Sequence, residues 1–561
     1  MLLKPLSTWL LPTAAISATA LQLRTQDYVP QSLNDTIKEL GLEEYMKHLP
    51  NFNEKKRDEA LASRCSRACN TLRDMLHSEV QFPGLIPYAA NKGSYWAKQQ
   101  SDLSPSCFLA AKGSRSVAMA LTVSQKTQCP FAVRGGGHSI VPGASNTDVG
   151  ITIDLRAFDE VKLSGDKKIV SVGPGATWLD VYKVLDQHDL TVVGGRASTV
   201  GVSGLTLGGG ISFISGRGGF ACDNIMKYQV MMADGQVLDV DYNSHPLLYF
   251  ALRGGGNNFG VVLRFDFETF PLGKLWGGKR TYDIAAKEAI NSGLSSYNDN
   301  ASDDPDLAII TTFIGRRKNY FSLVFFDYAK PQADPPILKS SFKDLYKFRP
   351  TTDTTRFTNM SDLVLEIGLS TPRGFRQRFA TLTYKNSVEL QNNMVDIFME
   401  EVKKIEDKVF GPEVFLPVIA FQPVPTTVSS KFSKRGGNAL GVSASDGPLI
   451  GQYPGSSPIF PSTQTNHLYR TVVNLAFQWT SPVDDRAIEL AMDRTVSRTN
   501  EIAMKKGLSY DYLYTNYAAP NQKPMTSYGA ANVRKLREAQ AKYDPQKVFE
   551  QLQPGGFKLN M

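Results

Sequence analysis

A run of three glycines followed by a histidine is the most distinctive chemical feature of this chain. It spans Arg134 to Ser139 and directly follows the apolar stretch Pro130 to Val133. Consecutive glycines accept positive φ angles and let a ligand approach the backbone closely. Their N–H groups can then point into one concavity and bind an anion such as a diphosphate. We therefore predict a phosphate-bearing cofactor here; a glycine-rich turn with an incidental histidine is the alternative.

Further glycine blocks favour the cofactor interpretation. Thr199 to Gly204 and Gly208 to Gly210 follow later in the chain, and Arg253 to Gly260 comes next. Because glycine weakens strands, so many glycines in one region exceed what turns require, and they predict a large phosphorylated ligand. A Rossmann fingerprint does not explain them, since Gly173 to Gly175 lacks the third glycine and its central Pro174 has no N–H.

A second chemical pattern lies in the C-terminal part of the chain. Tyr512, Tyr514 and Asn516 occupy every second position, so on an extended segment their side chains would face one side. A tyrosine there is our predicted general base, provided that a cationic or polar neighbour lowers its pKa from about 10. Gln478, in an expected strand at 473–479, is predicted to project over the reacting group. Tyrosines that only pack in the core are the alternative.

Short apolar runs bounded by Gly, Pro or Asp predict the strands that position the glycine loops. The region 83–272 is glycine-rich and strand-like, with few expected helices. Helical spacing of apolar residues predicts one helix that begins at Thr177 and another through 117–123. Strands are expected at 131–133, 151–155, 169–172, 190–193 and 261–267.

After residue 272 the pattern changes to longer strands, expected at 307–314, 320–328, 379–384 and 471–479. Two amphipathic helices are expected at Ser387 to Val409 and Asp485 to Lys505. This pattern predicts an α+β fold, with an antiparallel sheet covered by helices. The expected parts are a signal peptide at 1–20, an N-terminal helical segment at 21–82, a cofactor domain at 83–272, a substrate domain at 273–505 and a C-terminal segment at 506–561.

Composition and charge narrow the functional class. Of 561 residues, 42% are hydrophobic and 21% charged, as in globular proteins and unlike disordered or fibrous ones. The net charge of +8 is spread thinly along the chain, which gives little support to nucleic-acid binding. No apolar segment is long enough to span a membrane. We expect an enzyme with a small-molecule substrate, no nucleic-acid partner and no membrane span, and the oligomeric state stays open.

The first twenty residues indicate a secretory signal. Lys4 precedes an apolar run, and Ala18 to Ala20 offers small residues for cleavage. We therefore expect the protein outside the cell or in a secretory compartment, either vesicular or vacuolar. Glycosylation sequons at Asn34, Asn300 and Asn359 fit this route.

Five cysteines are expected to act mainly as disulfides in such an oxidising compartment. Cys65, Cys69, Cys107 and Cys129 are predicted to pair, with three possible connectivities. A zinc half-site at Cys65 and Cys69 is the weaker alternative, because no matching Cys/His pair lies nearby. Cys222 is left as a buried free thiol.

Together these motifs resemble those of the berberine bridge enzyme-like FAD-linked oxidoreductases, which have the vanillyl-alcohol oxidase/p-cresol methylhydroxylase (PCMH) fold. The resemblance implies a two-subdomain PCMH-type FAD-binding domain, a substrate domain and a C-terminal segment that returns to the FAD domain. It covers most of the chain beyond residue 80. The matching runs are Arg134 to Ser139, Ser198 to Gly201 with its trailing glycines, Gly219 to Asn224, Gly255 to Gly260, Tyr543 to Pro545 and Gln553 to Phe557.

The resemblance also implies roles for single residues. His138 matches the histidine that binds the flavin 8α-methyl carbon covalently, a link that makes flavin a stronger hydride acceptor. Ala197 stands where many relatives have a second linking cysteine, so one covalent bond is expected. Val200 matches a position that controls the approach of O2; a β-branched core residue is the alternative. Tyr514 and Asn516 resemble the family's Tyr-x-Asn element beside the flavin ring.

These observations give two sets of predicted site residues. Predicted catalytic residues are Tyr514, Tyr512, Asn516 and Gln478. Predicted FAD contacts are Arg134, Gly135, Gly136, Gly137, His138, Ser139, Thr199, Val200, Gly201, Gly204, Gly208, Gly209, Asn224, Gly260 and Val261.

The implied function is that of an FAD-dependent oxidase. A base would remove a proton from a hydroxyl, phenol or amine while a hydride passes to flavin N5, and O2 would reoxidise the flavin. Relatives of this type carry out oxidations or oxidative cyclisations in secondary-metabolite biosynthesis. The alternatives are a secreted carbohydrate oxidase and a non-redox cyclase or isomerase that retains FAD structurally. A binding protein with a vestigial site is disfavoured by the intact glycine blocks.

Overall fold

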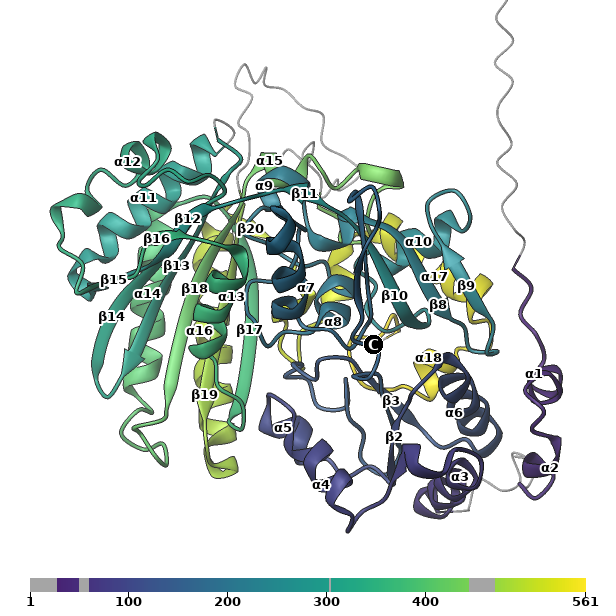
Figure 1. The fold of residues 1–561 in the computed structure, drawn as a ribbon. Coiled ribbons are helices and arrows are strands. Elements are labelled where there is room, and N and C mark those ends of the chain that lie inside the picture. Colours follow the sequence, from purple (N-terminus) through teal and green to yellow (C-terminus); the bar gives the residue numbers. More distant parts are fainter. Residues whose placement is uncertain (1–27, 50–59, 302–303, 443–469, 561) are drawn as a thin grey trace, which may run out of the picture.

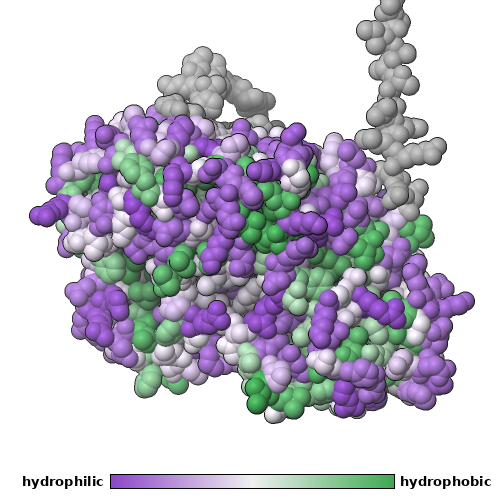
Figure 2. Space-filling model, in the orientation of Figure 1, coloured by the Kyte–Doolittle hydropathy of each residue, from purple (hydrophilic) through white to green (hydrophobic). Residues whose placement is uncertain are grey.

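The computed structural model describes residues 28–49, 60–301, 304–442 and 470–560 (Figure 1). One half of the molecule is a large sheet with helices on its outer face, and the other contains smaller sheets with helices around them. The face in Figure 2 is mainly hydrophilic, with separate apolar patches. In the described ranges, no helix is both long and apolar enough to cross a membrane. The expected signal peptide at 1–20 lies outside the described residues.

The first small sheet carries the glycine run at its edge. Its strand order is β1 (Val80–Gln81), β2 (Cys107–Ala110), β4 (Ile151–Asp154) and β3 (Phe131–Arg134). Strands β2, β4 and β3 are parallel, and helix α6 (Ser114–Thr127) provides the crossover that a parallel pair needs. Helix α3 (Leu61–Leu76) packs with α6 on this sheet. The glycine run starts where β3 ends.

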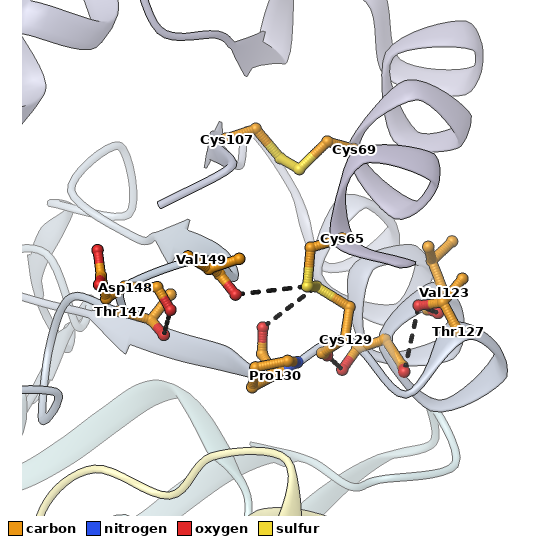
Figure 3. Close-up of a disulfide and its surroundings, with 11 residues drawn as sticks. Cys65, Cys69, Cys107, Val123, Thr127, Cys129, Pro130, Thr147, Asp148 and Val149 are labelled. Atoms are coloured by element: carbon orange, nitrogen blue, oxygen red, sulfur yellow. Dashed lines mark hydrogen bonds between the residues drawn. A yellow bond between two sulfur atoms is a disulfide. The ribbon is translucent and has the colours of Figure 1, made fainter. Parts of the chain in front are cut away.

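Two disulfides tie helix α3 to this sheet (Figure 3). Cys65 bonds to Cys129, just before β3, and Cys69 bonds to Cys107, at the start of β2. The predicted pairing of these four cysteines is confirmed, and the connectivity that the sequence left open is now fixed. Because residues four apart lie on the same side of a helix, both α3 cysteines face the strands. Cys222 is free and buried, as expected.

The second small sheet is antiparallel. Its order is β5 (Val161–Leu163), β6 (Ile169–Val172), β10 (Val261–Glu268), β8 (Ile225–Met231) and β9 (Val237–Val240). Helix α7 (Trp178–Leu185) begins where predicted, because Thr177 and Asp180 form a capping box. The expected strand at 190–193 is only β7 (Leu190–Thr191), which pairs with β11 (Phe270–Pro271).

The half with the two small sheets, called the cofactor half from here on, contains more helices than expected. A helix is recognised from the spacing of its apolar residues only in a window of about 11 to 18 residues, and these helices are shorter. They are α4 (Ile86–Gly93), α5 (Lys98–Ser101), α8 (Val202–Leu207), α9 (Ser215–Gly218) and α10 (Pro246–Leu252). The N-terminal helices α1 (Leu33–Glu39) and α2 (Glu43–Met46) are short as well.

The large sheet has nine strands, and all its pairs are antiparallel. Their order is β15 (Thr352–Asp353), β12 (Leu275–Asp283), β14 (Asn319–Tyr328), β13 (Leu307–Arg316), β18 (Leu416–Val424), β19 (Arg470–Trp479), β17 (Arg376–Lys385) and β20 (Ser509–Tyr510), with β16 (Arg356–Thr358) beside β12.

Four helices cover one face of this sheet: α11 (Lys287–Asn300), α12 (Pro336–Ser341), α14 (Val388–Lys403) and α16 (Asp485–Lys505). Strand β19 shows how the two faces differ. Val473, Leu475 and Phe477 join the core under the helices, whereas Asn474 and Gln478 face the cofactor half, as the two-residue period of a strand requires. The predicted α+β fold is confirmed.

The C-terminal segment packs on the cofactor half through α17 (Ala530–Tyr543) and α18 (Val548–Gln551), coloured yellow in Figure 1. The Phe131 N–H donates to Leu552 O at 2.6 Å, and the rings of Phe131 and Phe549 meet edge to face. The segment that follows α18 brings Gln553 and Phe557 to the glycine loops. Between the two halves lies α13 (Met360–Leu369), which contacts α7 and β12.

One buried carboxyl group of the large sheet predicts a pH-dependent stability. Asp327 in β14 is 1% exposed, and its carboxylate has no hydrogen-bond partner among the described residues. Burial raises the pKa of Asp327 to about 8. The folded state therefore keeps a proton that the unfolded chain releases near pH 4, so stability falls between about pH 4 and pH 8, by up to about 1.4 kcal/mol per pH unit.

We expect Asp327→Asn to remove most of this pH dependence, because the amide resembles the neutral acid. In thermal unfolding at pH 5, Asp327→Asn should melt at nearly the same temperature as the original protein. At pH 8 the variant should melt at a higher temperature than the original protein. The exposed Asp511→Asn serves as the control and should follow the original protein at both pH values. A variant Asp327→Asn that keeps the original pH dependence would contradict this account.

Candidate active site

One large cavity lies between the glycine loops and the inner face of the large sheet. It measures about 510 Å³, within the usual range for ligand and cofactor sites. Glycine blocks that are far apart in the sequence therefore share one concave surface. The predicted site residues that line it are Gly135, Gly136, Gly137, His138, Ser139, Val200, Gly201, Gly204, Gly208, Gly260, Val261, Tyr514, Asn516 and Gln478.

The loop after β3 offers a row of free amide donors. The N–H groups of Gly136, Gly137, His138 and Ser139 donate to no acceptor within the described ranges. Gly137 has a φ of 68°, in the left-handed region that favours glycine. Unpaired N–H groups on a cavity wall favour an anionic ligand.

Two glycines from different loops touch backbone to backbone. A methyl group built on Gly136 would lie 2.6 Å from Gly201 Cα, and one built on Gly201 would lie 2.6 Å from Gly136 N. Gly208 is also closed in, since a methyl group there would lie 2.1 Å from Asn516 Oδ1. Backbone packing therefore restricts Gly136 and Gly201 to glycine.

The residues of the cavity fit FAD. The free amides of the β3 loop suit a diphosphate, and the apolar side chains of Val133, Leu155, Leu205 and Val262 on the same wall suit a flat ring system. His138 borders the same space. Val200 and Ala197 also line the cavity.

Arg134 was predicted to contact the cofactor, but its side chain is not part of the cavity lining. The guanidinium lies 3.7 Å from the centre of the Tyr95 ring and donates hydrogen bonds to Asn91 O and Ser94 Oγ. Arg134 ends strand β3, and its side chain leaves the strand on the side opposite the cavity. It supports the glycine loop from behind.

Three other predicted contacts also lie outside the lining. Asn224 Nδ2 donates to Gly218 O and Phe220 O, so Asn224 holds a turn in shape. Gly209 is enclosed by neighbouring side chains and has a φ of 115°. Thr199 reaches the side chain of His138 instead. The motif match located loops that line the cavity, but a motif alone does not show which loop residues face inward.

His138 is held between two side chains. Its ring lies parallel to the Trp96 indole, with centroids 4.1 Å apart and 12° between the planes. Its Nε2 is 3.2 Å from Thr199 Oγ1. The ring keeps some exposure to the cavity, but burial lowers the pKa of His138 to about 3. The imidazole is therefore neutral at ordinary pH, and one of its nitrogens keeps a free electron pair.

The segment that bears the tyrosines is not extended, contrary to the prediction. The chain leaves the sheet after β20, and Thr515–Tyr517 forms a 3-10 turn. Such a turn rotates successive residues by roughly 120°, so the two-residue alternation fails. Tyr514, Asn516 and Tyr517 line the cavity, whereas Tyr512 does not. The Tyr512 hydroxyl is buried and has no hydrogen-bond partner in the described part of the chain.

The Tyr514 hydroxyl acts as an acceptor for the backbone. It accepts hydrogen bonds from the N–H groups of Gly210 and Ile211 at 3.1 and 3.0 Å, and from Asn516 Nδ2 at 3.0 Å. Burial raises the pKa of Tyr514 above its usual value, in the direction opposite to the one predicted. Tyr514 and Asn516 thus fix the glycine block at 208–210.

The Tyr517 hydroxyl is hydrogen-bonded to a cationic side chain. Arg196 Nη2 donates to the Tyr517 hydroxyl at 2.7 Å, and this hydroxyl donates to Gln422 Oε1 at 3.1 Å. Arg196 also donates to Gln422 Oε1, and all three side chains line the cavity. Sequence reasoning missed this group because, on the expected extended segment, Tyr517 would face away from Tyr514 and Asn516. Nothing else in the sequence indicated this group, because Arg196 is a single arginine in a loop.

The inner face of the large sheet supplies amide and apolar side chains. Gln377 Nε2 donates to Gln478 Oε1 at 3.2 Å, between β17 and β19. Asn474 Oδ1 is buried without a hydrogen-bond partner among the described residues. The apolar and aromatic side chains of this face are Ile310, Phe325, Phe379, Leu416 and Val418. Most of this wall therefore suits a neutral, apolar ligand.

Comparison with protein families matches two parts of the chain. Residues 105–241 match an FAD binding domain, and residues 513–554 match the family described as berberine and berberine like. The first match contains the β3 loop and Thr199 to Gly210. The second contains the segment with Tyr514, Asn516 and Tyr517.

Similar proteins cover nearly the whole chain. The FAD-dependent monooxygenase FUP4 of Fusarium proliferatum is 36% identical, over 88% of this chain and 94% of its own length. The FAD-dependent monooxygenase tpcD of Cochliobolus heterostrophus is also 36% identical, with coverages of 88% and 94%. The structure of 6-hydroxy-D-nicotine oxidase from Arthrobacter nicotinovorans has a TM-score of 0.69 at 19% identity, covering 86% of this chain and 98% of that one. The fold is thus shared.

Proposed function

The chain belongs to the berberine bridge enzyme-like FAD-linked oxidoreductases, and from this premise we propose that it oxidises a neutral, largely apolar substrate. In this proposal a hydride passes from a hydroxyl, phenolic or amine group to flavin N5, and O2 accepts the electrons. The reaction is an oxidation or oxidative cyclisation in secondary-metabolite biosynthesis. Similarity to fungal FAD-dependent monooxygenases supports a redox role for FAD over a purely structural one.

We infer the substrate class from the kinds of side chain that line the cavity wall. Among the described residues that line it, none is Asp, Glu or Lys, and Arg196 is engaged by Tyr517 and Gln422. Gln377 and Gln478 are bonded to each other. A sugar carries hydroxyl groups on every side and needs a polar partner for each buried one. This wall therefore favours an apolar substrate over the carbohydrate alternative.

FAD, when bound, supplies the two-electron acceptor. Tyr517 Oη is the group that we propose takes the proton from the substrate hydroxyl or amine as the hydride leaves. Arg196 Nη2 lies 2.7 Å from that oxygen and holds it in position. Gln422 orients the Tyr517 side chain. Trp96 and Phe379 add aromatic surface to the cavity wall.

The tether and the redox reaction can be tested on the purified protein. After acid denaturation, we expect yellow flavin on the peptide that contains His138, and no attached flavin in His138→Ala. Anaerobic addition of apolar alcohols or phenols should bleach the flavin, and air should restore its colour with release of H2O2. Bleaching by sugars alone would support the carbohydrate oxidase. Product formation with a flavin that stays oxidised would support the cyclase or isomerase.

We also propose that the protein resides outside the cell or in a secretory compartment. The two disulfides, Cys65–Cys129 and Cys69–Cys107, support an oxidising environment, since reducing compartments keep such thiols free. Fractionation of the producing cells, with the protein detected by antibody, tests this location.

A further inference from the structure

We infer that Thr199 is a positioning residue for the covalent bond between His138 and FAD. Its hydroxyl holds the Nε2 edge of the imidazole, and the Trp96 ring fixes the imidazole plane, so that Nδ1 is the nitrogen left to form the bond. This inference rests on the tether proposed above. It assigns Thr199 a role toward the protein's own histidine, in place of the direct cofactor contact predicted from the sequence.

The geometry around His138 carries the argument. Thr199 Oγ1 is 3.2 Å from Nε2, and Thr199 does not line the cavity, so its hydroxyl serves the histidine. On the ring face, the Trp96 indole is 4.1 Å away and nearly parallel. Trp96 is itself fixed, because its Nε1 donates to Thr371 O at 3.0 Å. The imidazole is thus held at one edge and on one face.

The hydroxyl occupies Nε2 and leaves Nδ1 for the bond. A neutral imidazole has one N–H and one nitrogen with a free pair, and a hydroxyl can accept from the first or donate to the second. In the tautomer whose Nε2–H donates to Thr199 Oγ1, the free pair lies on Nδ1. Burial keeps the ring neutral, so this pair is available for bonding. Without the hydroxyl, the imidazole can turn within the plane that Trp96 sets.

Formation of the tether balances with O2 as the oxidant. The Nδ1 pair forms a bond to the 8α carbon, and one C–H bond of that methyl group breaks with loss of a proton. The two electrons of the C–H bond stay in the flavin ring. Nε2 releases its hydrogen as a proton along the bond to Thr199. O2 then collects two electrons and two protons as H2O2, which leaves an oxidised, tethered flavin.

The test measures the time course of tethering. Apoprotein is mixed with FAD in air, samples are precipitated in acid, and flavin fluorescence retained by the protein is compared with total bound flavin. We expect Thr199→Val to tether about 10- to 100-fold more slowly, as when other histidine-orienting partners are removed, with total FAD binding unchanged. Thr199→Ser should restore the rate. Thr206→Val, which loses a buried bond to Val202 O instead, should tether like the original protein.

The outcomes separate this inference from the proposed function. If the original protein retains no flavin after acid, the tether itself is wrong. If it tethers normally and Thr199→Val tethers equally fast, the role of Thr199 is wrong. Should Thr199→Val prove insoluble, Thr199→Ala removes the same hydroxyl without added bulk and gives the same decision. Slow tethering in both Thr199→Val and Thr199→Ser would also overturn the inference, because the hydroxyl would not be the cause.

Discussion

Replacement of Tyr517 by phenylalanine is expected to lower kcat by about 10²- to 10⁴-fold, the usual contribution of a general base. The change removes only the hydroxyl that Arg196 and Gln422 hold. The ring stays, and it meets the Tyr514 ring edge to face with centroids 4.8 Å apart. FAD content and melting temperature should therefore match the original protein. Anaerobic stopped-flow reduction of the flavin, with any compound that the original protein oxidises, measures the affected step.

Two other tyrosines are matched controls for this prediction. Tyr512→Phe removes a buried hydroxyl without a partner in the described structure, so we expect unchanged kcat and equal or higher stability. Tyr514→Phe leaves the amides of Gly210 and Ile211 unpaired, so it should reduce stability and FAD binding. Full activity in Tyr517→Phe, or an equal loss in Tyr512→Phe, would rule out Tyr517 as the base.

The second large effect is expected at the contact between the glycine loops. Gly136→Ala places a methyl group 2.6 Å from Gly201 Cα and 2.7 Å from Gly201 N, and neither loop can move without changing the cavity wall. Overpacking of this kind costs about 1–3 kcal/mol. We expect a cost at the upper end of this range, because both contacting groups are backbone and neither can rotate away. We expect FAD affinity to fall by about 100-fold. Fluorescence titration of apoprotein with FAD measures this change.

Gly165→Ala is the control for the glycine prediction. A methyl group at Gly165 has no neighbour within 4 Å, so affinity for FAD and melting temperature should be unchanged. Circular dichroism of Gly136→Ala shows whether the variant is folded before FAD is added. Folded Gly136→Ala with the original FAD affinity would mean that the two loops are not held together in solution.

The cofactor side of the site was largely predictable from the sequence. A run such as Gly135 to Gly137 has few uses besides close backbone approach, so the chemistry follows from residue type alone. Most predicted glycines indeed line one cavity. The direction of individual side chains was not predictable. Arg134 and Thr199 belong to the right loops but support neighbouring side chains, because their orientation depends on the tertiary contacts of Asn91 and His138.

The substrate side was less predictable because the segment with the tyrosines does not follow the two-residue alternation expected of an extended strand. The turn at Thr515–Tyr517 moved Tyr517 into the cavity and left Tyr512 in the core. Strand β18 was missed altogether. It contains Pro417 and Pro423 although it lies between β13 and β19, and proline normally argues against a central strand. Gln422 is part of β18, so the partner of Tyr517 was missed with the strand.

The order in which the cavity is built along the chain has a consequence for biosynthesis. Gln553, Gly556 and Phe557 form part of its wall, and Asn257 Nδ2 donates to Gly555 O at 3.0 Å. While a ribosome is still short of this segment, the nascent chain has every glycine loop but an incomplete pocket. The wall of the FAD site is therefore complete only after residue 557 has been translated, and the proposed attachment to His138 would be a maturation step of an already folded polypeptide.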